Sequence, residues 1–230
     1  MTLQEAIVAR HSVRAYRDEP LAPEAVKALE EKIAEVNRRG RLHVQLVQNE
    51  PEAFKSPLAK YGKFVGVNHY LIMAGVKAND LDERIGYYGE ELVLLAQTLG
   101  LNTCWVGLTY RKVPGTFQLA DGEVVKAAIS IGYGVTQGVS HKIKSVSQVS
   151  NADASTPAWF LRGVEAALLA PTAINQQKFH FEYLGVGDGQ RARVRARRGI
   201  PIVGFTQMDL GIAKLHFELG AGRDNFDWVE

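Results

Sequence analysis

The stretch that decides the fold is Gly89–Gly100 (GEELVLLAQTLG), which runs directly into Leu101–Gly107 (LNTCWVG). Its apolar residues recur at helical spacing, which predicts a long helix that opens at Asp80 or Asp82. The closing glycine suits the left-handed backbone position that often follows a helix. The apolar and β-branched residues beyond it predict a strand over Thr103–Leu108.

The same spacing rules predict the elements on either side of this unit. Helices are predicted over Leu3–Ala9, Glu24 to about Arg38, Pro157–Leu169 and Met208–Leu219. Strands are predicted around Leu42–Leu46 and over Val65–Val76, Val124–Tyr133, Lys178–Val186 and Phe226–Val229. A solvated loop is predicted for Arg191–Arg198 and a turn for Gly185–Gly189. We therefore expect an α+β fold with a central mixed or antiparallel sheet flanked by helices.

An internal similarity suggests two related halves. Asp209–Gly220 (DLGIAKLHFELG) repeats the pattern of Gly89–Gly100, an apolar helix with a Leu-Gly stop. A predicted strand with a tryptophan follows each helix, Trp105 in one case and Trp228 in the other. Many α/β units share this pattern, so a common unit without any repeat stays an open alternative. The polar segment 139–155 is predicted to connect a first half, 1–138, to a second half, 156–230.

The composition limits the classes of protein to which this chain can belong. Of the 230 residues, 46% are hydrophobic and 23% are charged, which is enough apolar material for a substantial core. The net charge of +2 gives no support for a surface that coats nucleic acid. Cys104 is the single cysteine, which excludes an intrachain disulfide and fits a reducing cytosol. Without a secretory signal or an apolar run approaching ~20 residues, we expect a cytoplasmic protein that does not enter a membrane.

Five residues, four of them polar or charged, follow the first predicted helix: Arg10, His11, Ser12, Val13 and Arg14. A guanidinium group offers a planar fork of donors that matches phosphate oxygens, and the serine hydroxyl adds a neutral donor. The run therefore suits a phosphate monoester. A short basic run is more often a solvated surface, so this pattern alone does not decide the function.

A second cluster, Leu169–Gln177 (LAPTAINQQ), follows the apolar helix of the second half. A proline stops the helix, and small residues then let the backbone approach a ligand closely. The amides that follow carry both donors and acceptors, which suits the edge of a flavin ring or its ribityl hydroxyls. A helix end with a polar turn is the simpler interpretation of this segment taken by itself.

Together these motifs resemble the nitroreductase family of flavoproteins. The run at Arg10–Arg14 resembles its Arg-Arg-Ser signature, Ala170–Gln177 its Ala-Pro-Ser signature, and Leu99–Gly107 its Leu-Gly-Leu-Gly-x-Cys-Trp-Ile-Gly segment. The resemblance implies a nitroreductase-like fold that binds FMN and receives hydride from NAD(P)H. It implies contacts to the phosphate and ribityl chain from Arg10, His11, Ser12 and Arg14. It places at the flavin ring Pro171, Thr172, Ala173, Asn175 and Gln177, with the backbone of Cys104, Trp105, Val106 and Gly107 close by.

The order of the motifs departs from the common family pattern, in which the Ala-Pro-Ser segment follows the first signature by a few dozen residues. Here the first half carries the phosphate signature and the second half carries the ring signature. This order resembles a subgroup of fused pseudo-dimers from thermophilic bacteria. It implies one intact FMN site and an empty second, pseudo-symmetric site, in a protein that is a monomer or a homodimer.

Other residues lead to plainer expectations. Cys104 is predicted to be a small buried residue rather than a nucleophile. The histidines lack metal-ligand spacing, so no metal site is expected. The leading hypothesis is an FMN-dependent oxidoreductase that reduces nitro compounds, quinones or a related small electron acceptor by a ping-pong route, without a catalytic side chain of its own. Two alternatives stay open: a flavin-binding protein for storage, delivery or sensing with little turnover, and an α+β binding domain without flavin.

Overall fold

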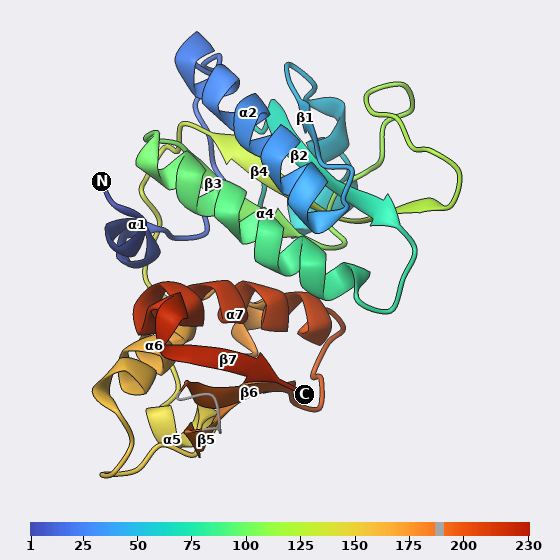
Figure 1. The fold of residues 1–230 in the computed structure, drawn as a ribbon. Helices are drawn as coiled ribbons and strands as arrows, with labels where there is room; N and C mark the ends of the chain where they lie inside the picture. The colour runs from blue at the N-terminus through green and yellow to red at the C-terminus, as the bar shows by residue number, and fades with distance from the viewer. Residues whose placement is uncertain (187–190) are drawn as a thin grey trace.

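The structure, a computed structural model, describes residues 1–186 and 191–230. Its strands fall into two sheets, and two long helices run between them (Figure 1). The predicted α+β class is confirmed, although the strands form two sheets instead of the single central sheet expected. Gly187–Gly189, part of the predicted turn, and Gln190 lie outside the described residues.

The helix stop at Gly100 has the predicted form. Helix α4 covers Leu81–Thr98, and Gly100 takes φ +78°, the left-handed region that glycine adopts without strain. Gly100 N donates to Gln97 O at 3.1 Å and Leu101 N donates to Ala96 O at 2.9 Å. These two bonds form a Schellman cap, which satisfies the last carbonyls of the helix. The cap directs the chain into β3, Asn102–Val106.

The first sheet has the strand order β1-β2-β4-β3, and every neighbouring pair is antiparallel. Its strands besides β3 are β1 (Gln45–Val47), β2 (His69–Val76) and β4 (Glu123–Gly132). Strand β2 begins later than predicted because Gly66 has φ +69° and bends the chain before it. Strand β1 also begins later, because the Asn37 side chain bonds both backbone groups of Val44 in place of a strand neighbour.

The second sheet has the order β5-β6-β7, with β5 and β6 antiparallel and β6 and β7 parallel. Its strands are β5 (Phe179–Val186), β6 (Ala192–Arg198) and β7 (Phe226–Val229). The solvated loop predicted for Arg191–Arg198 is therefore wrong. Ala192 and Val194 are buried on one side of β6 while Arg193 is exposed on the other. This alternation is the period of a half-buried strand.

Helices cover the two sheets and pack against one another between them. They are α1 (Leu3–Ala9), α2 (Pro23–Gly40), α3 (Pro57–Tyr61), α5 (Val146–Val149), α6 (Ala158–Leu168) and α7 (Thr206–Ala221), with short 3₁₀ turns at Glu52–Phe54, Ala173–Asn175 and Arg223–Asn225. The predicted first helix is capped by Thr2 as expected. In α2 the left-handed residue is Arg41 rather than Gly40, whose missing side chain makes room for the ring of Tyr88.

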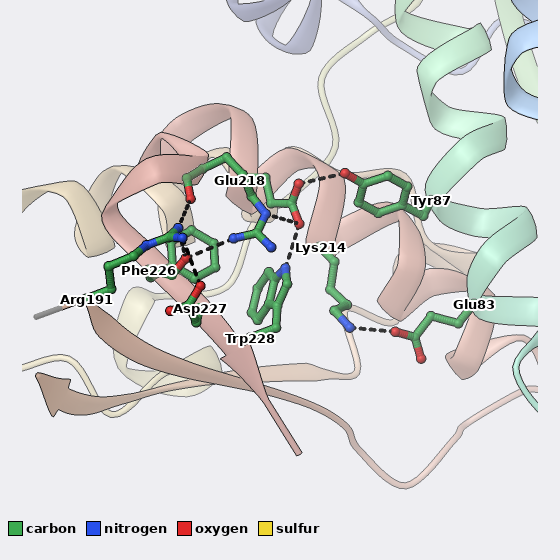
Figure 2. Close-up of polar contacts among 9 residues, drawn as sticks. Glu83, Tyr87, Arg191, Lys214, Glu218, Phe226, Asp227 and Trp228 are labelled. Carbon is green, nitrogen blue, oxygen red and sulfur yellow. Dashed lines mark hydrogen bonds and ion pairs between the residues drawn. The ribbon is translucent and has the colours of Figure 1, made fainter. Parts of the chain in front are cut away.

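The α4–α7 pair joins the four-stranded sheet to the three-stranded one (Figure 1). Gly86 and Gly211 let the helices approach until an added Cβ would meet the Met208 and Glu83 carbonyls, respectively. Polar contacts follow the same seam (Figure 2): Lys214 Nζ lies 2.7 Å from Glu83 Oε1, and the Tyr87 hydroxyl donates to Glu218. Along the chain, the connection predicted at 139–155 follows β4, in the first sheet, and precedes β5, in the second. Its role as a boundary between halves stays a prediction.

The helices also bear on membrane insertion. Across residues 1–186 and 191–230, no helix combines the length and the apolar character that a bilayer crossing needs.

We expect Gly211→Ala to lower the free energy of unfolding by about 1–3 kcal/mol, because the new methyl group would be forced against the α4 backbone. Urea unfolding monitored by circular dichroism measures the change. Gly204→Ala is the matched control, since an added Cβ at Gly204 meets no atom within 4 Å. Equal stabilities of the two variants would contradict the close helix contact.

Candidate functional site

The first motif lies along the outer edge of β3. Ser12 forms a parallel β-bridge with Thr103, and Val13 N donates to Thr103 O at 3.0 Å. Because the backbone groups of a strand alternate between its two edges, those of Trp105 face outward with Thr103, away from β4. The free edge of β3 therefore offers backbone donors and acceptors next to the first motif.

Burial divides the residues of this motif. Arg14 is exposed, and its guanidinium carbon lies 6.0 Å from the centre of the Phe64 ring. His11 and Ser12 are half-buried, whereas Arg10 is only 4% exposed. Arg14 is thus the cation that the motif presents to a ligand from solvent.

The side chain of Arg10 enters the interior and meets a buried carboxylate. Its Nε lies 3.8 Å from Glu90 Oε1, and its Nη2 donates to the Leu169 carbonyl at 3.4 Å. Glu90 also accepts from Trp105 Nε1 at 2.8 Å and contacts His216 Nε2 at 2.9 Å. Burial lowers the pKa of Arg10, while the neighbouring Glu90 acts in the opposite direction. This cluster connects the first motif to the end of α6, directly before the second motif.

The second motif has an unusual backbone. Ile174, Asn175 and Gln177 all have positive φ, at +48°, +57° and +43°. Each such residue costs on the order of 1–3 kcal/mol and persists only where its surroundings fix it. Ile174 is β-branched and 69% exposed, so its own packing does not offset the strain. The loop is held in a shape that its local sequence disfavours.

Two groups that the sequence reasoning did not select hold this loop on α7. Asp209 accepts from Ala173 N at 3.0 Å and from Gln176 Nε2 at 2.8 Å. Gln176 Oε1 in turn accepts from Ile202 N at 3.1 Å. Burial raises the pKa of Asp209 to about 6. A single acid within the mostly apolar run Met208–Ala213 of α7 was the available sequence signal.

The amides of the second motif are bonded within the protein. Asn175 Nδ2 and Gln177 Nε2 donate to Lys142 O at 2.8 and 2.9 Å, and Gln177 Oε1 accepts from Lys144 N at 3.0 Å. Thr172 Oγ1 accepts from Gln177 N at 3.1 Å. The two amide side chains therefore hold the second motif against segment 139–155. Their contacts with a flavin ring stay a prediction.

Two histidines lie where segment 139–155 passes the first motif. His141 Nε2 lies 3.1 Å from the Leu168 carbonyl, and the His11 Cβ contacts the position where a Cβ of Gly138 would stand. Burial lowers the pKa of both imidazoles, and the nearby positive charge of Arg10 acts in the same direction. Cys104 is buried, as predicted, and burial raises the pKa of its thiol.

A cavity of about 310 Å³ opens at the end of β3. Phe205, at the start of α7, places its ring against Gly107, one of the predicted flavin-segment residues. Phe205 and Lys112, which also line the cavity, did not stand out in the sequence because neither belongs to a recognisable motif. The structure thus gathers all three predicted segments and adds a cavity beside one of them.

Comparisons with known proteins identify the family and the fold. The sequence profile of the family described as "Putative TM nitroreductase" matches residues 2–221. A putative nitroreductase from Thermotoga maritima has a similar structure, with a TM-score of 0.66 and 23% identity over 97% of this chain and 85% of that chain. No protein with a curated function matches.

More distant structures show the same fold. A putative nitroreductase in complex with FMN from Desulfovibrio desulfuricans has a TM-score of 0.51 and 16% identity, over 68% of this chain and 99% of that chain. NfrA2 from B. megaterium has a TM-score of 0.53 and 16% identity, over 73% and 82% of the two chains. At these identities the likeness establishes the fold alone.

The buried carboxyl group of Asp209 predicts a pH dependence of stability. Its pKa is higher in the folded protein than the usual 3.8, so the folded state holds this proton more tightly than the unfolded state. Its contribution is therefore largest below pH ~4 and is lost as the pH rises to about 6, by roughly 3 kcal/mol. Unfolding free energies of wild type and Asp209→Asn, measured from pH 4 to 7, should diverge by this amount. Parallel profiles would show that Asp209 titrates normally.

Proposed function

The chain belongs to the family described as putative TM nitroreductases, and from this membership and the site geometry we propose that it is an FMN-dependent oxidoreductase. It takes hydride from NAD(P)H and reduces a small electron acceptor, such as a nitro compound or a quinone, by a ping-pong route. We further propose that it works in the cytoplasm as a monomeric pseudo-dimer or a homodimer with one intact FMN site.

The observation that carries this proposal is the meeting of three segments that are far apart in the sequence. Ser12 bridges to Thr103 on β3, and Arg10 reaches the carbonyl of Leu169, the residue two before Pro171. The phosphate signature, the strand edge and the ring signature thus border one region. If the three segments belonged to unrelated surfaces, these contacts between them would not be expected.

The residues present fit FMN. The exposed Arg14 and the half-buried Ser12 and His11 would hold the phosphate and ribityl chain, since guanidinium and hydroxyl donors match phosphate oxygens. The outward backbone groups of Trp105 would meet the polar edge of the ring. Arg10 Nε has no hydrogen-bond acceptor within the described residues, so the buried guanidinium keeps donor capacity beside this region.

The loop Pro171–Gln177 would supply the second wall. Its amide side chains are occupied by Lys142 and Lys144, so the wall would present its fixed backbone and Thr172 rather than mobile amides. When bound, FMN supplies reversible hydride chemistry. The chain would contribute position and electrostatics: it would bind the phosphate, fix the ring between two rigid walls and keep cations near the site.

The proposal predicts that the purified protein retains FMN after desalting and that NADPH bleaches its ~450 nm band without oxygen. Arg14→Ala should weaken FMN binding roughly 10- to 100-fold, because it removes a charge-assisted phosphate contact. A titration followed by flavin fluorescence measures the dissociation constant. Arg38→Ala, an exposed arginine on α2, is the control and should bind like wild type.

The outcomes separate the competing functions. Retained flavin that NADPH does not bleach would favour a flavin-binding protein with little turnover. Failure to take up FMN, together with identical behaviour of the two arginine variants, would contradict the flavin proposal as a whole.

A further inference from the structure

The cavity at the end of β3 is lined by two aromatic rings and two lysines. Its volume, about 310 Å³, lies at the lower end of the ~300–1,000 Å³ range of small-molecule pockets. That size suits a ligand with one or two rings. The cavity is lined by Gly107, Leu108, Tyr110, Lys112, Val125, Lys126 and Phe205.

One wall of the cavity contains a residue with a strained backbone. Phe205 has φ +74°, in the left-handed region that side chains rarely adopt, and it immediately precedes α7. This backbone sets the ring against Gly107, where any side chain would collide with it. Tyr110 supplies a second aromatic ring to the same cavity. Strain that places an aromatic ring at a cavity is the kind of outlier that marks a binding site.

The charge of the lining is one-sided. Lys126 is paired, with its Nζ 2.9 Å from Asp82 Oδ1, whereas Lys112 forms no ion pair with any residue that the structure describes. Every lining residue comes from one of three stretches that contain neither aspartate nor glutamate: 92–120, 124–152 and 189–208. None of the lining residues is acidic, so Lys112 adds a positive charge to the cavity, which favours an anionic ligand.

A second cavity, of about 300 Å³, shows the contrast. It lies beside Trp228, and its cations are neutralised within the protein: Lys214 by Glu83 (Figure 2) and Arg84 by Asp80. The two cations that line that cavity are thus paired with acids, and three acids line it, whereas no acid lines the first cavity.

We propose that the cavity beside Gly107 binds an aromatic ring with an anionic substituent, of the aromatic carboxylate class, with Lys112 facing the anion and Phe205 packing on the ring. The inference rests on the proposed function in taking this ligand as the electron acceptor. For a nitro-substituted ligand the reaction balances as one nitro group, one NAD(P)H and one proton giving a nitroso group, NAD(P)⁺ and water.

Equilibrium binding tests the proposal without turnover. The dissociation constants of 4-nitrobenzoate and its neutral match 4-nitrobenzamide are measured by calorimetry, without NAD(P)H, on FMN-free and FMN-loaded protein. We expect the anion to bind about 2- to 5-fold more tightly, as one solvent-accessible ion pair allows, with the preference falling as salt is added. Lys112→Gln should abolish the preference, and Lys112→Arg should keep it.

Matched controls keep the outcome clear. Lys27→Gln removes an exposed lysine on α2 and should retain the preference of wild type. Phe205→Ala should weaken both ligands alike, because it removes ring packing and no charge. Equal affinities in wild type, an unchanged preference in Lys112→Gln, or release of FMN by 4-nitrobenzoate would each overturn the assignment. A Lys112-dependent preference in protein that never binds FMN would instead leave the cavity standing and remove the proposed function.

Discussion

The arrangement of the molecule depends on the contacts that the buried carboxylate of Glu90 makes. A charge with no exposed surface is tolerated only when other groups compensate it closely, since its desolvation costs several kcal/mol. Three side chains surround it: Arg10 from the N-terminal run, Trp105 from β3 and His216 from α7. Removing any of them would leave a charge or a polar group unsatisfied. The requirement therefore fixes where the first motif, the strand and the second half lie relative to one another.

This constraint separates two kinds of residue within the motifs. Arg10, Asn175 and Gln177 direct polar groups into the protein, toward Glu90 and the Lys142 and Lys144 backbone. Arg14 is exposed, and Ser12 and the outer edge of β3 lie beside it, where the proposed ligand would bind. Motif residues thus fall into those that shape the walls and those that face the space between them. The strained loop at Ile174 follows the same logic, because its conformation is stabilised from outside by the Gln176–Asp209 contacts.

The sequence predicted the elements whose signal is local and missed those whose signal is tertiary. Helix α4 and its glycine stop were predictable because apolar spacing and a left-handed glycine act within a few residues. Strand β6 was missed because its arginines suggested solvent, although Ala192 and Val194 carry the period of a strand. The burial of Arg10 depends on Glu90, eighty positions away, and the role of Asp209 depends on the Gln176 amide. Neither partner can be found from spacing along the chain.

The two cavities differ in charge although each lies near a similar helix and strand. In both of these units a tryptophan donates to a glutamate on the preceding helix, Trp105 to Glu90 and Trp228 to Glu218. Glu90 is wholly buried. Glu218 is only partly buried and also accepts a hydrogen bond from the Tyr87 hydroxyl. The cations near Glu218 are already paired. Beside Gly107 the nearby stretches lack acids, and Lys112 stays available. Similar backbone units therefore present different electrostatic surroundings, and charge, rather than fold, determines which of them suits an anionic ligand.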